Sequence, residues 1–222
     1  MSEIQHNIQK QIIRVLMGKK VSRYSDMRPR NANSNLYNYH LKKLLSGGYV
    51  LKNGREYRLA PKGLRYVDRL SLETFESRRQ PKLVTSAILL DEMGRVLMYK
   101  QPKQPFIDGY TIPIGKIHEE DASISAAMSR ELKEKLGVDI TPIYTGQYYM
   151  RVLQEGEHIT TILNHVFRAR VSADIEVQKG EWVEVGLLKD SDMYPGIKEI
   201  LGSSMNNEQF TIQDLTIDYD PS

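Results

Sequence analysis

The chain has 222 residues, of which 40% are hydrophobic and 27% charged, a composition typical of folded globular proteins and not of disordered ones. It contains no cysteine, which excludes disulfide bonds, thiolate zinc ligands and a cysteine nucleophile. No apolar run is long enough to cross a bilayer, and the first residues lack the basic and apolar regions of a signal peptide, so we expect a cytoplasmic protein with no membrane partner.

Charge is divided unevenly along the chain. Residues 1–82 hold 18 basic and six acidic residues, a net charge of +12, whereas residues 83–222 hold 13 basic and 22 acidic residues, a net charge of −9. A difference of this size predicts two domains with different partners, residues 1–80 and residues 81–222. A compact module of charge +12 attracts polyanions, and double-stranded DNA is the first candidate partner.

The basic half begins with helical segments. Apolar residues at helical spacing predict an amphipathic helix over residues 4–17, which Gly18 ends. Ser22 is expected to cap a short second segment that stops at Arg28-Pro29. A third helix is predicted over residues 34–46 and should turn four leucines inward: Leu36, Leu41, Leu44 and Leu45.

A hairpin and a further helix follow. Residues 49–59 predict a β-hairpin that turns at Asn53-Gly54, because both residues of such a turn need a positive φ. Residues 61–70 predict a helix that could extend to Glu76, and residues 77–82 then break the pattern. This helix would suit either coupling between the domains or formation of a dimer.

The order helix, helix, helix, hairpin and the segment from Ser34 to Val50 resemble the winged helix-turn-helix of bacterial and archaeal regulators. The resemblance covers about residues 4–70 and implies that residues 34–46 form a recognition helix. Asn can bond adenine in the major groove, and Lys can reach guanine or phosphate. The expected DNA contacts are Asn35, Asn38, Tyr39 and Lys42 on the outer face of the helix, flanked by Arg28, Arg30, Lys52 and Arg55. His40 is expected to be a packed, hydrogen-bonded histidine.

The acidic half predicts a sheet with one long helix. The expected strands are residues 84–90, 95–100, 144–153, 159–170 and 181–186. A helix over about residues 123–136 follows the acidic loop 118–121 and stops at Gly137. The polar, acidic tail 202–222 could be a strand, a dimer arm or a disordered segment.

Gly115 and residues 130–138, Arg-Glu-Leu-Lys-Glu-Lys-Leu-Gly-Val, resemble the Nudix box, Gly-x5-Glu-x7-Arg-Glu-U-x-Glu-Glu-x-Gly-U, where U is aliphatic. The resemblance spans about residues 83–201 and implies an α/β fold, an α/β/α sandwich with a mixed sheet. It also implies Mg²⁺-dependent cleavage of a nucleoside diphosphate linked to another moiety. The implied metal ligands are Glu131 and Glu134, helped by Asp121 or Glu120, and Arg130 orients them.

Two departures from the box bear on catalysis. Lys135 stands where the family has a Glu that binds metal, and Asp121 lies one residue too far from Arg130. An ammonium beside Glu131 would take the place of the metal ion; it could bind phosphate but could not activate water as a metal does. In the alternative, Lys135 turns to solvent and the acidic loop supplies the missing ligand.

Without hydrolysis, the domain would still offer a pocket for a nucleotide-like ligand. The candidate phosphate-binding residues are Lys135, Lys116, Lys100, Lys103, Arg151 and Gly115. Phe106, Tyr110, Tyr148 and Tyr149 could stack on a ring, although a place in the core is equally open to each, and Trp182 is expected to be structural.

The two modules together resemble Nudix-related transcription regulators with the domain order reversed. This pairing predicts a homodimeric, DNA-binding regulator whose operator affinity changes when a nucleotide-like metabolite binds. One alternative is an active Mg²⁺-dependent Nudix hydrolase with an accessory winged helix. Another is a protein-binding adaptor whose winged helix never touches DNA.

Overall fold

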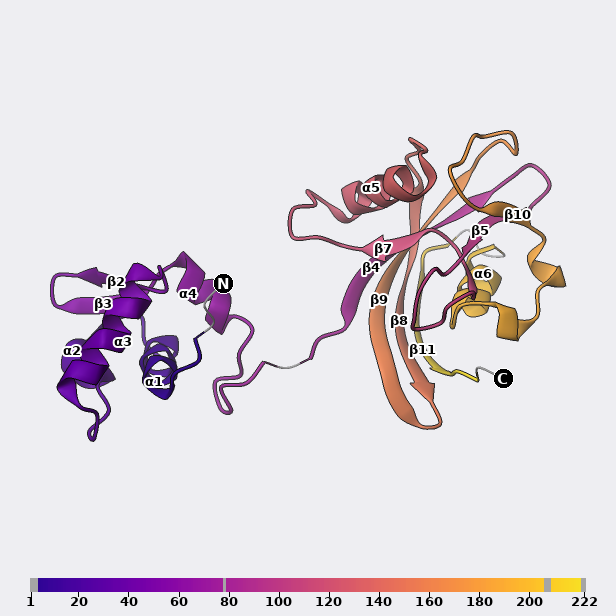
Figure 1. The fold of residues 1–222 in the computed structure, drawn as a ribbon. Coiled ribbons are helices and arrows are strands. Elements are labelled where there is room, and N and C mark those ends of the chain that lie inside the picture. The colour runs from indigo at the N-terminus through magenta and orange to yellow at the C-terminus, as the bar shows by residue number, and fades with distance from the viewer. Residues whose placement is uncertain (1–3, 78, 206–208, 221–222) are drawn as a thin grey trace. The chain divides into compact units, whose positions relative to one another are not determined.

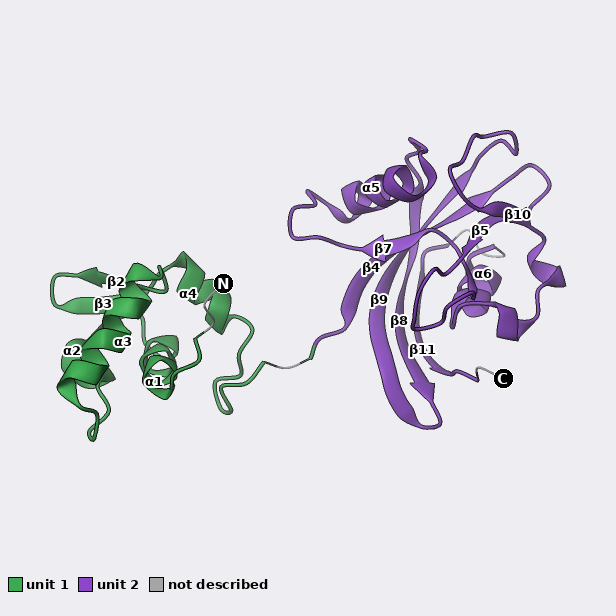
Figure 2. Cartoon of the chain, in the orientation of Figure 1, with its two compact units in different colours: residues 1–79 green, residues 80–222 purple. Residues whose placement is uncertain are grey.

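The computed structural model describes residues 4–77, 79–205 and 209–220 of the protein (Figure 1). The chain divides into two compact units, residues 1–79 and residues 80–222 (Figure 2). Each unit has a hydrophobic core of its own. Across the described ranges, no helix is both long enough and apolar enough to cross a membrane.

The first unit combines helices with a small antiparallel sheet. Its helices are α1 (Asn7–Met17), α2 (Tyr24–Met27), α3 (Ser34–Ser46) and α4 (Pro61–Val67). Its strands are β1 (Ser22–Arg23), β2 (Val50–Asn53) and β3 (Glu56–Leu59), in the order β1-β3-β2. The hairpin β2–β3 therefore follows α3 directly, as the sequence predicts.

The helix ends in this unit have local causes. His6 caps α1, because its Nδ1 accepts a hydrogen bond from the Ile8 amide at 3.2 Å. Asn33 caps α3 in the same way, accepting from the Asn35 amide at 2.8 Å. Gly47 ends α3, so the helix predicted over residues 34–46 is confirmed in both bounds.

The core of the first unit forms where α1 packs on α3. Tyr37, Leu41 and Leu44 of α3 are buried there, but Leu36 is 45% exposed, so its predicted inward position is wrong. The buried stripe runs through Tyr37 because Tyr37 shares a helical face with Leu41 and Leu44, whereas Leu36 lies about 100° away from it. The Tyr37 ring also meets Tyr24 edge-on at 5.0 Å.

Two predictions around the small sheet are wrong. Ser22 does not cap α2, because it is buried in β1 and Arg23 holds the N-cap position without a side-chain bond. The hairpin turns one residue later than predicted. Asn53 pairs with Glu56, so the turn residues are Gly54 and Arg55, and of these only Gly54 has a positive φ, +59°.

The helix predicted over residues 61–70 is shorter in the structure. It ends at Val67, where the chain passes into a turn. Its buried residue is Gly63, whereas Leu64 is 56% exposed. A Cβ at Gly63 would lie 2.1 Å from the Tyr49 carbonyl oxygen, which shows how closely α4 approaches the hairpin. The chain then turns back, and Phe75 packs against the core of this unit.

The second unit is built on a mixed sheet. The strand order is β10 (Glu181–Val183), β5 (Val96–Lys100), β4 (Lys82–Leu90), β9 (Glu157–Arg170), β8 (Ile143–Gln154), β11 (Thr211–Asp218). Two short strands join it, β6 (Tyr110–Thr111) beside β5 and β7 (Ile114–Lys116) beside β4. The pairs β4–β9 and β8–β11 are parallel and the others antiparallel, which confirms the mixed sheet.

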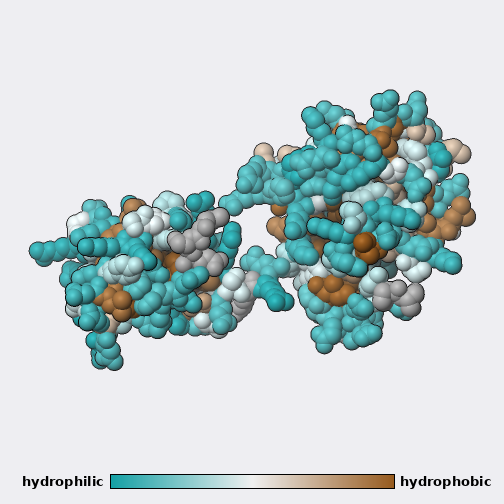
Figure 3. Space-filling view, in the orientation of Figure 1, coloured by the Kyte–Doolittle hydropathy of each residue, from teal (hydrophilic) through white to brown (hydrophobic). Residues whose placement is uncertain are grey.

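One helix packs on each face of this sheet. On one face α5 (Ile124–Leu136) contributes Met128, Leu132 and Leu136 to a buried cluster. On the other face α6 (Ile197–Met205) contributes Ile197, Ile200 and Leu201. The α/β class is thereby confirmed. In the view of Figure 3 the surface is mostly hydrophilic, and the apolar areas are small and separate.

The C-terminal segments differ in part from prediction. The strand predicted over residues 181–186 ends at Val183 and passes into a 3₁₀ turn, η1 (Val185–Leu187); a second, η2 (Asp190–Asp192), precedes α6. The tail forms a strand, β11, beside β8. Residues 206–208 and 221–222 of the tail lie outside the described residues. Helix α6 was not predicted.

Candidate functional site

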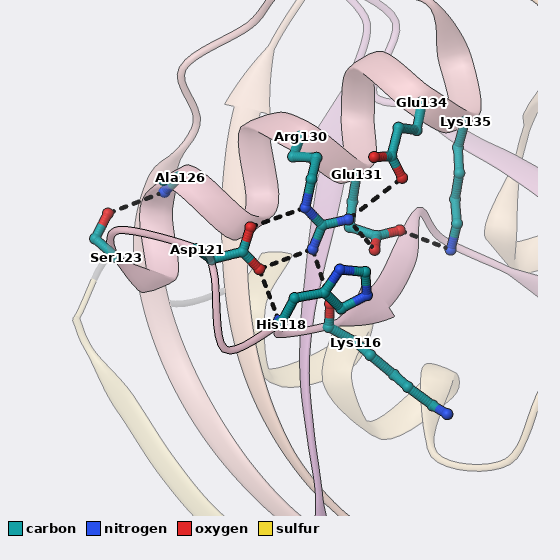
Figure 4. A network of polar contacts seen from close by, with 9 residues as sticks. All are labelled: Lys116, His118, Asp121, Ser123, Ala126, Arg130, Glu131, Glu134 and Lys135. Atoms are coloured by element: carbon teal, nitrogen blue, oxygen red, sulfur yellow. Dashed lines mark hydrogen bonds and ion pairs between the residues drawn. The ribbon is translucent and has the colours of Figure 1, made fainter. Parts of the chain in front are cut away.

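Helix α5 carries the centre of the site. Ser123 caps its first turn, with Oγ accepting from the Ala126 amide at 3.0 Å (Figure 4). Gly137 ends the helix with φ +76°. The apolar stripe of this helix is interrupted by Glu131, which is only 5% exposed. A buried carboxylate is costly unless charged or polar partners surround it.

Arg130 supplies part of that environment. Its Nη1 donates to Oε1 of Glu131 at 2.8 Å and reaches Oε2 of Glu134 at 3.3 Å. Its Nε and Nη2 donate to the two oxygens of Asp121, each at 2.8 Å, and Nη2 also bonds the Lys116 carbonyl at 3.0 Å. One guanidinium therefore joins the three carboxylates and the loop before the helix (Figure 4).

Asp121 is held in the ionised form. The hydrogen bond from Arg130 holds the pKa of Asp121 well below its usual range, and the bond from the His118 amide, at 2.7 Å, acts in the same direction. The extra residue between Asp121 and Arg130 is accommodated in this loop, where the Asp121 amide donates back to the His118 carbonyl. Glu120 is exposed in the same loop, away from the contacts that the structure describes for Arg130.

Gly115 makes room for the buried carboxylate. It lies in β7 opposite Thr85 of β4, and a Cβ built on it would lie 1.8 Å from the carboxyl carbon of Glu131. Glu131 can occupy its place only because this position carries no side chain. Gly115 thus acts on the site through Glu131.

Lys135 completes the surroundings of Glu131. Its Nζ lies 3.2 Å from Oε2 of Glu131, while Arg130 takes the other oxygen (Figure 4). The side chain of Lys135 is 26% exposed and does not turn away to solvent. The sequence left two positions open for Lys135, beside Glu131 or turned to solvent. In the structure Lys135 lies beside Glu131.

The residues present do not fit a magnesium ion. Mg²⁺ needs carboxylate oxygens that are open to it, at close range and in octahedral geometry. Both oxygens of Asp121 and both oxygens of Glu131 are already bound by Arg130 or Lys135. Across residues 4–77, 79–205 and 209–220, no three His, Asp or Glu side chains gather in a way that could hold a metal ion.

A cavity of about 590 Å³ opens beside this network. Its apolar wall includes Val84, Ile114 and Ile162, and Tyr99 and Tyr194 also line it. Its charged lining consists of five lysines and two carboxylates, namely Lys82, Lys103, Lys116, Lys135 and Lys179 with Glu131 and Glu134. The cavity is therefore cationic, and His118 also lines it.

Comparison with known proteins agrees with this architecture. A family model described as the NUDIX domain matches residues 80–201, more than half of the chain. The chain belongs to the Nudix family. No match was found among curated proteins.

Several solved structures resemble the Nudix domain at low identity. The MutT protein from Methanosarcina mazei Go1 is 21% identical over 57% of this chain and 85% of its own, with a TM-score of 0.40. A NUDIX hydrolase from Nitrosomonas europaea is 16% identical over 66% and 86%, with a TM-score of 0.46. The NUDIX domain of Shewanella oneidensis NrtR, complexed with ADP ribose, is 18% identical over 64% and 96%, with a TM-score of 0.45. The family assignment rests on the family model.

Other predicted residues of the Nudix domain lie outside the cavity. Lys100 is exposed, with its Nζ 5.2 Å from the Tyr110 ring, and Arg151 is exposed on β8.

Phe106 and Tyr148 are buried, and Tyr149 is 37% exposed away from the cavity lining. The hydroxyl of Tyr110 donates to Glu181, and the indole of Trp182 donates to the Ala173 carbonyl. Phe106, Tyr148 and Trp182 are therefore structural.

Sequence reasoning missed part of the cavity lining. Lys82, Lys179, His118, Tyr99 and Tyr194 line it, and none was proposed as a ligand-binding residue. They come from segments far apart in the chain, and no local spacing relates them. Residues 81–222 contain nine lysines, so lysine content alone does not single out those that line the cavity.

In the first unit, α3 presents a polar face to solvent. Asn35, Asn38, Tyr39 and Lys42 are all exposed on it, as predicted. The hydroxyl of Tyr24 donates to Oδ1 of Asn38 at 2.6 Å and so fixes the orientation of that amide.

The basic residues that flank this face differ in freedom. Arg30 and Arg55 are exposed, and Lys52 is exposed with its Nζ 5.7 Å from the Tyr57 ring. Arg28 is half-buried, and its Nη2 donates to the Ala32 carbonyl at 2.9 Å. Arg28 is thus held against its own loop, whereas the other three can reach outward.

His40 is packed, as predicted, but the predicted hydrogen bond is missing at one nitrogen. The ring is 7% exposed and stacks on His6 with 3.7 Å between centroids. Its Nδ1 has no hydrogen-bond partner within the described part of the chain. Burial, and then the neighbouring His6 and Lys43, lower the pKa of His40.

Proposed function

We propose that the protein is a DNA-binding transcription regulator that senses a nucleotide-like, phosphate-containing metabolite through a Nudix domain without hydrolytic activity. The observation that carries the sensing half is the ion pair between Lys135 and Glu131. It places a cation of the protein against the carboxylate that a catalytic metal ion would need. The neighbouring cationic cavity supports a phosphate-bearing ligand.

The DNA-binding half rests on the first unit. The order α1, α2, α3 and the hairpin β2–β3 is the order of a winged helix-turn-helix, with α3 as the recognition helix. The exposed residues of α3 would contact base edges, and Arg30, Lys52 and Arg55 would contact phosphates. Arg28 contributes less, because its guanidinium bonds the Ala32 carbonyl.

Asn38 has a defined role in this proposal. Because the Tyr24 hydroxyl donates to Oδ1, the amide nitrogen of Asn38 is the group that would donate to a base. Acceptors for such a donor lie in the major groove on adenine and guanine. Tyr24 would then act as a positioning residue for sequence recognition.

Ligand binding would act on DNA by linkage. A metabolite that binds the Nudix domain with different affinity in the free and in the operator-bound protein changes the operator affinity. The change in the free energy of operator binding equals the difference between the two free energies of metabolite binding. A homodimer would present two recognition helices to two half-sites.

The test of this function is operator selection from random DNA, followed by titration of the selected site with candidate metabolites. We expect salt-dependent binding that a phosphate-containing metabolite changes. Absence of DNA binding at low salt would reject the regulator and favour a protein-binding adaptor.

A second candidate, an active Mg²⁺-dependent hydrolase, is favoured by one observation. Glu134 is 58% exposed, and among the residues that the structure describes it is held only by the 3.3 Å contact with Arg130, so it could turn toward a metal ion. Turnover of ADP-ribose or a dinucleotide with Mg²⁺, lost in Glu134→Gln, would support this alternative.

A further inference from the structure

We propose that the ammonium of Lys135 stands in for a divalent cation, so that the cavity binds the phosphate groups of its ligand as the metal-free anion. Mg²⁺ then weakens binding instead of supporting it. The inference rests on the proposed sensing function and adds the form in which the ligand is recognised.

The charge around Glu131 disfavours a metal ion there. This carboxylate is buried, and each of its oxygens already faces a cation, Arg130 at 2.8 Å and Lys135 at 3.2 Å. A divalent ion at the same carboxylate would have to displace Lys135 while remaining near it. Two cations a few ångströms apart repel strongly where water is scarce.

The other two carboxylates offer a metal ion little more. Asp121 gives both oxygens to Arg130, which leaves Glu134 as the one carboxylate of the cavity lining that could accept an outside cation freely. Glu134 is more than half exposed, where a lone carboxylate binds Mg²⁺ poorly because the ion keeps its water shell. Apart from Glu134, the site therefore offers cations and not oxygen ligands to whatever enters.

Five lysines from different parts of the domain line the cavity. Lys82 comes from β4, Lys116 from β7 and Lys135 from α5, while Lys103 and Lys179 come from two loops. Lys82, Lys103 and Lys116 form no ion pair with any residue that the structure describes. An ammonium binds phosphate oxygens as a movable point charge. Because Mg²⁺ cancels part of the phosphate charge, this lining favours the free anion.

Pyrophosphate and ADP are suitable probes, titrated calorimetrically into the full chain in EDTA and again with millimolar Mg²⁺. We expect binding in EDTA and a weaker apparent affinity with Mg²⁺. Binding that appears only with Mg²⁺ would overturn this inference and leave the sensing function standing. If neither probe binds in either buffer, both the inference and phosphate sensing by this cavity are wrong.

Substitutions at two positions of α5 give matched variants. Lys135→Gln should weaken pyrophosphate binding about tenfold, an effect typical of losing one charged contact. Lys133→Gln removes the same charge from an exposed position of the same helix and should leave binding unchanged. Equal losses in both variants would mean that general charge, and not the position beside Glu131, governs binding.

Manganese binding provides a readout that does not depend on the phosphate probes. By electron paramagnetic resonance, the wild-type chain should hold no Mn²⁺ at the site, whereas Lys135→Glu should gain a bound ion. Lys133→Glu is the control and should gain none. A tight Mn²⁺ site in the wild-type chain, lost in Glu134→Gln, would contradict the inference even if the Lys135 variants failed to fold.

Discussion

Helices α3 and α5 are built alike and used differently. Each has 13 residues, a side-chain N-cap and a glycine at its C-terminal end. Helix α3 keeps its polar face in solvent, whereas α5 turns one of its charged residues, Glu131, into the sheet and surrounds it with cations. A solvent-exposed face can change residue by residue at little cost, but a buried charge network must be kept or replaced as a whole.

The largest effect is expected when Arg130 is removed from the buried charge network of α5. Arg130→Gln should lower the free energy of unfolding by about 3 kcal/mol, because it leaves the buried carboxylate of Glu131 short of a partner. Urea unfolding of the second unit measures the loss. Arg30→Gln, in an exposed residue of the first unit, is the control and should cost little. A small loss in Arg130→Gln would mean that Glu131 does not depend on this guanidinium.

The next effect is expected at Gly115. Gly115→Ala places a methyl group where the Glu131 carboxylate lies, so either the strand or the ion pairs must shift, at a cost of about 2 kcal/mol. Gly186→Ala is the matched control, because its Cβ would meet nothing within 4 Å. Thermal unfolding of both variants would decide, and equal melting temperatures would contradict the packing described for Glu131.

The corresponding changes on α3 should alter binding and leave stability intact. Lys42→Ala should weaken DNA binding by about 1 kcal/mol and make it less dependent on salt, while Asn38→Ala weakens binding to the preferred sequence. Fluorescence anisotropy at several salt concentrations measures both.

Tyr24→Phe should relax sequence preference by freeing Asn38, and an unchanged preference would reject the positioning role of Tyr24.

The smallest effect concerns His40 and pH. Its pKa is lower in the folded protein than in the unfolded chain, so the unfolded chain binds more protons as the solution becomes acidic. Stability of the first unit is thus fully present above about pH 6.5 and should fall below it. Urea unfolding above and below about pH 6.5 measures this loss of stability. His40→Phe should remove much of the dependence of stability on pH. An equal acid loss in His40→Phe would assign it to other groups.

The contrast between the helices also explains what the sequence could predict. The bounds of α3 and its outer residues follow from helical periodicity and from local caps at Asn33 and Gly47. The inward place of Leu36 was wrong because a tyrosine, Tyr37, was not expected to fill the core. Its hydroxyl finds the Tyr24 carbonyl at 3.4 Å, a partner that no local pattern reveals.

The site on α5 could be predicted only in part. The box residues Arg130, Glu131 and Lys135 are close in sequence, so their mutual contacts follow from helix geometry. The remaining cavity depends on which loops the sheet brings together, and Lys82 and Lys179 are related only by the fold. Helix α6 was missed because it is nine residues long and its last turns carry Gly202 and two serines.

The most direct test of the central claim is a combined hydrolysis and thermal-shift screen of the purified chain. It would use ADP-ribose, NAD, dinucleoside polyphosphates, nucleoside triphosphates and nucleotide sugars, each in EDTA and again with Mg²⁺ or Mn²⁺. The account predicts a rise in melting temperature with at least one of these compounds and no turnover of any. Metal-dependent turnover that is abolished in Glu134→Gln would contradict it and show that the domain is an active hydrolase despite Lys135.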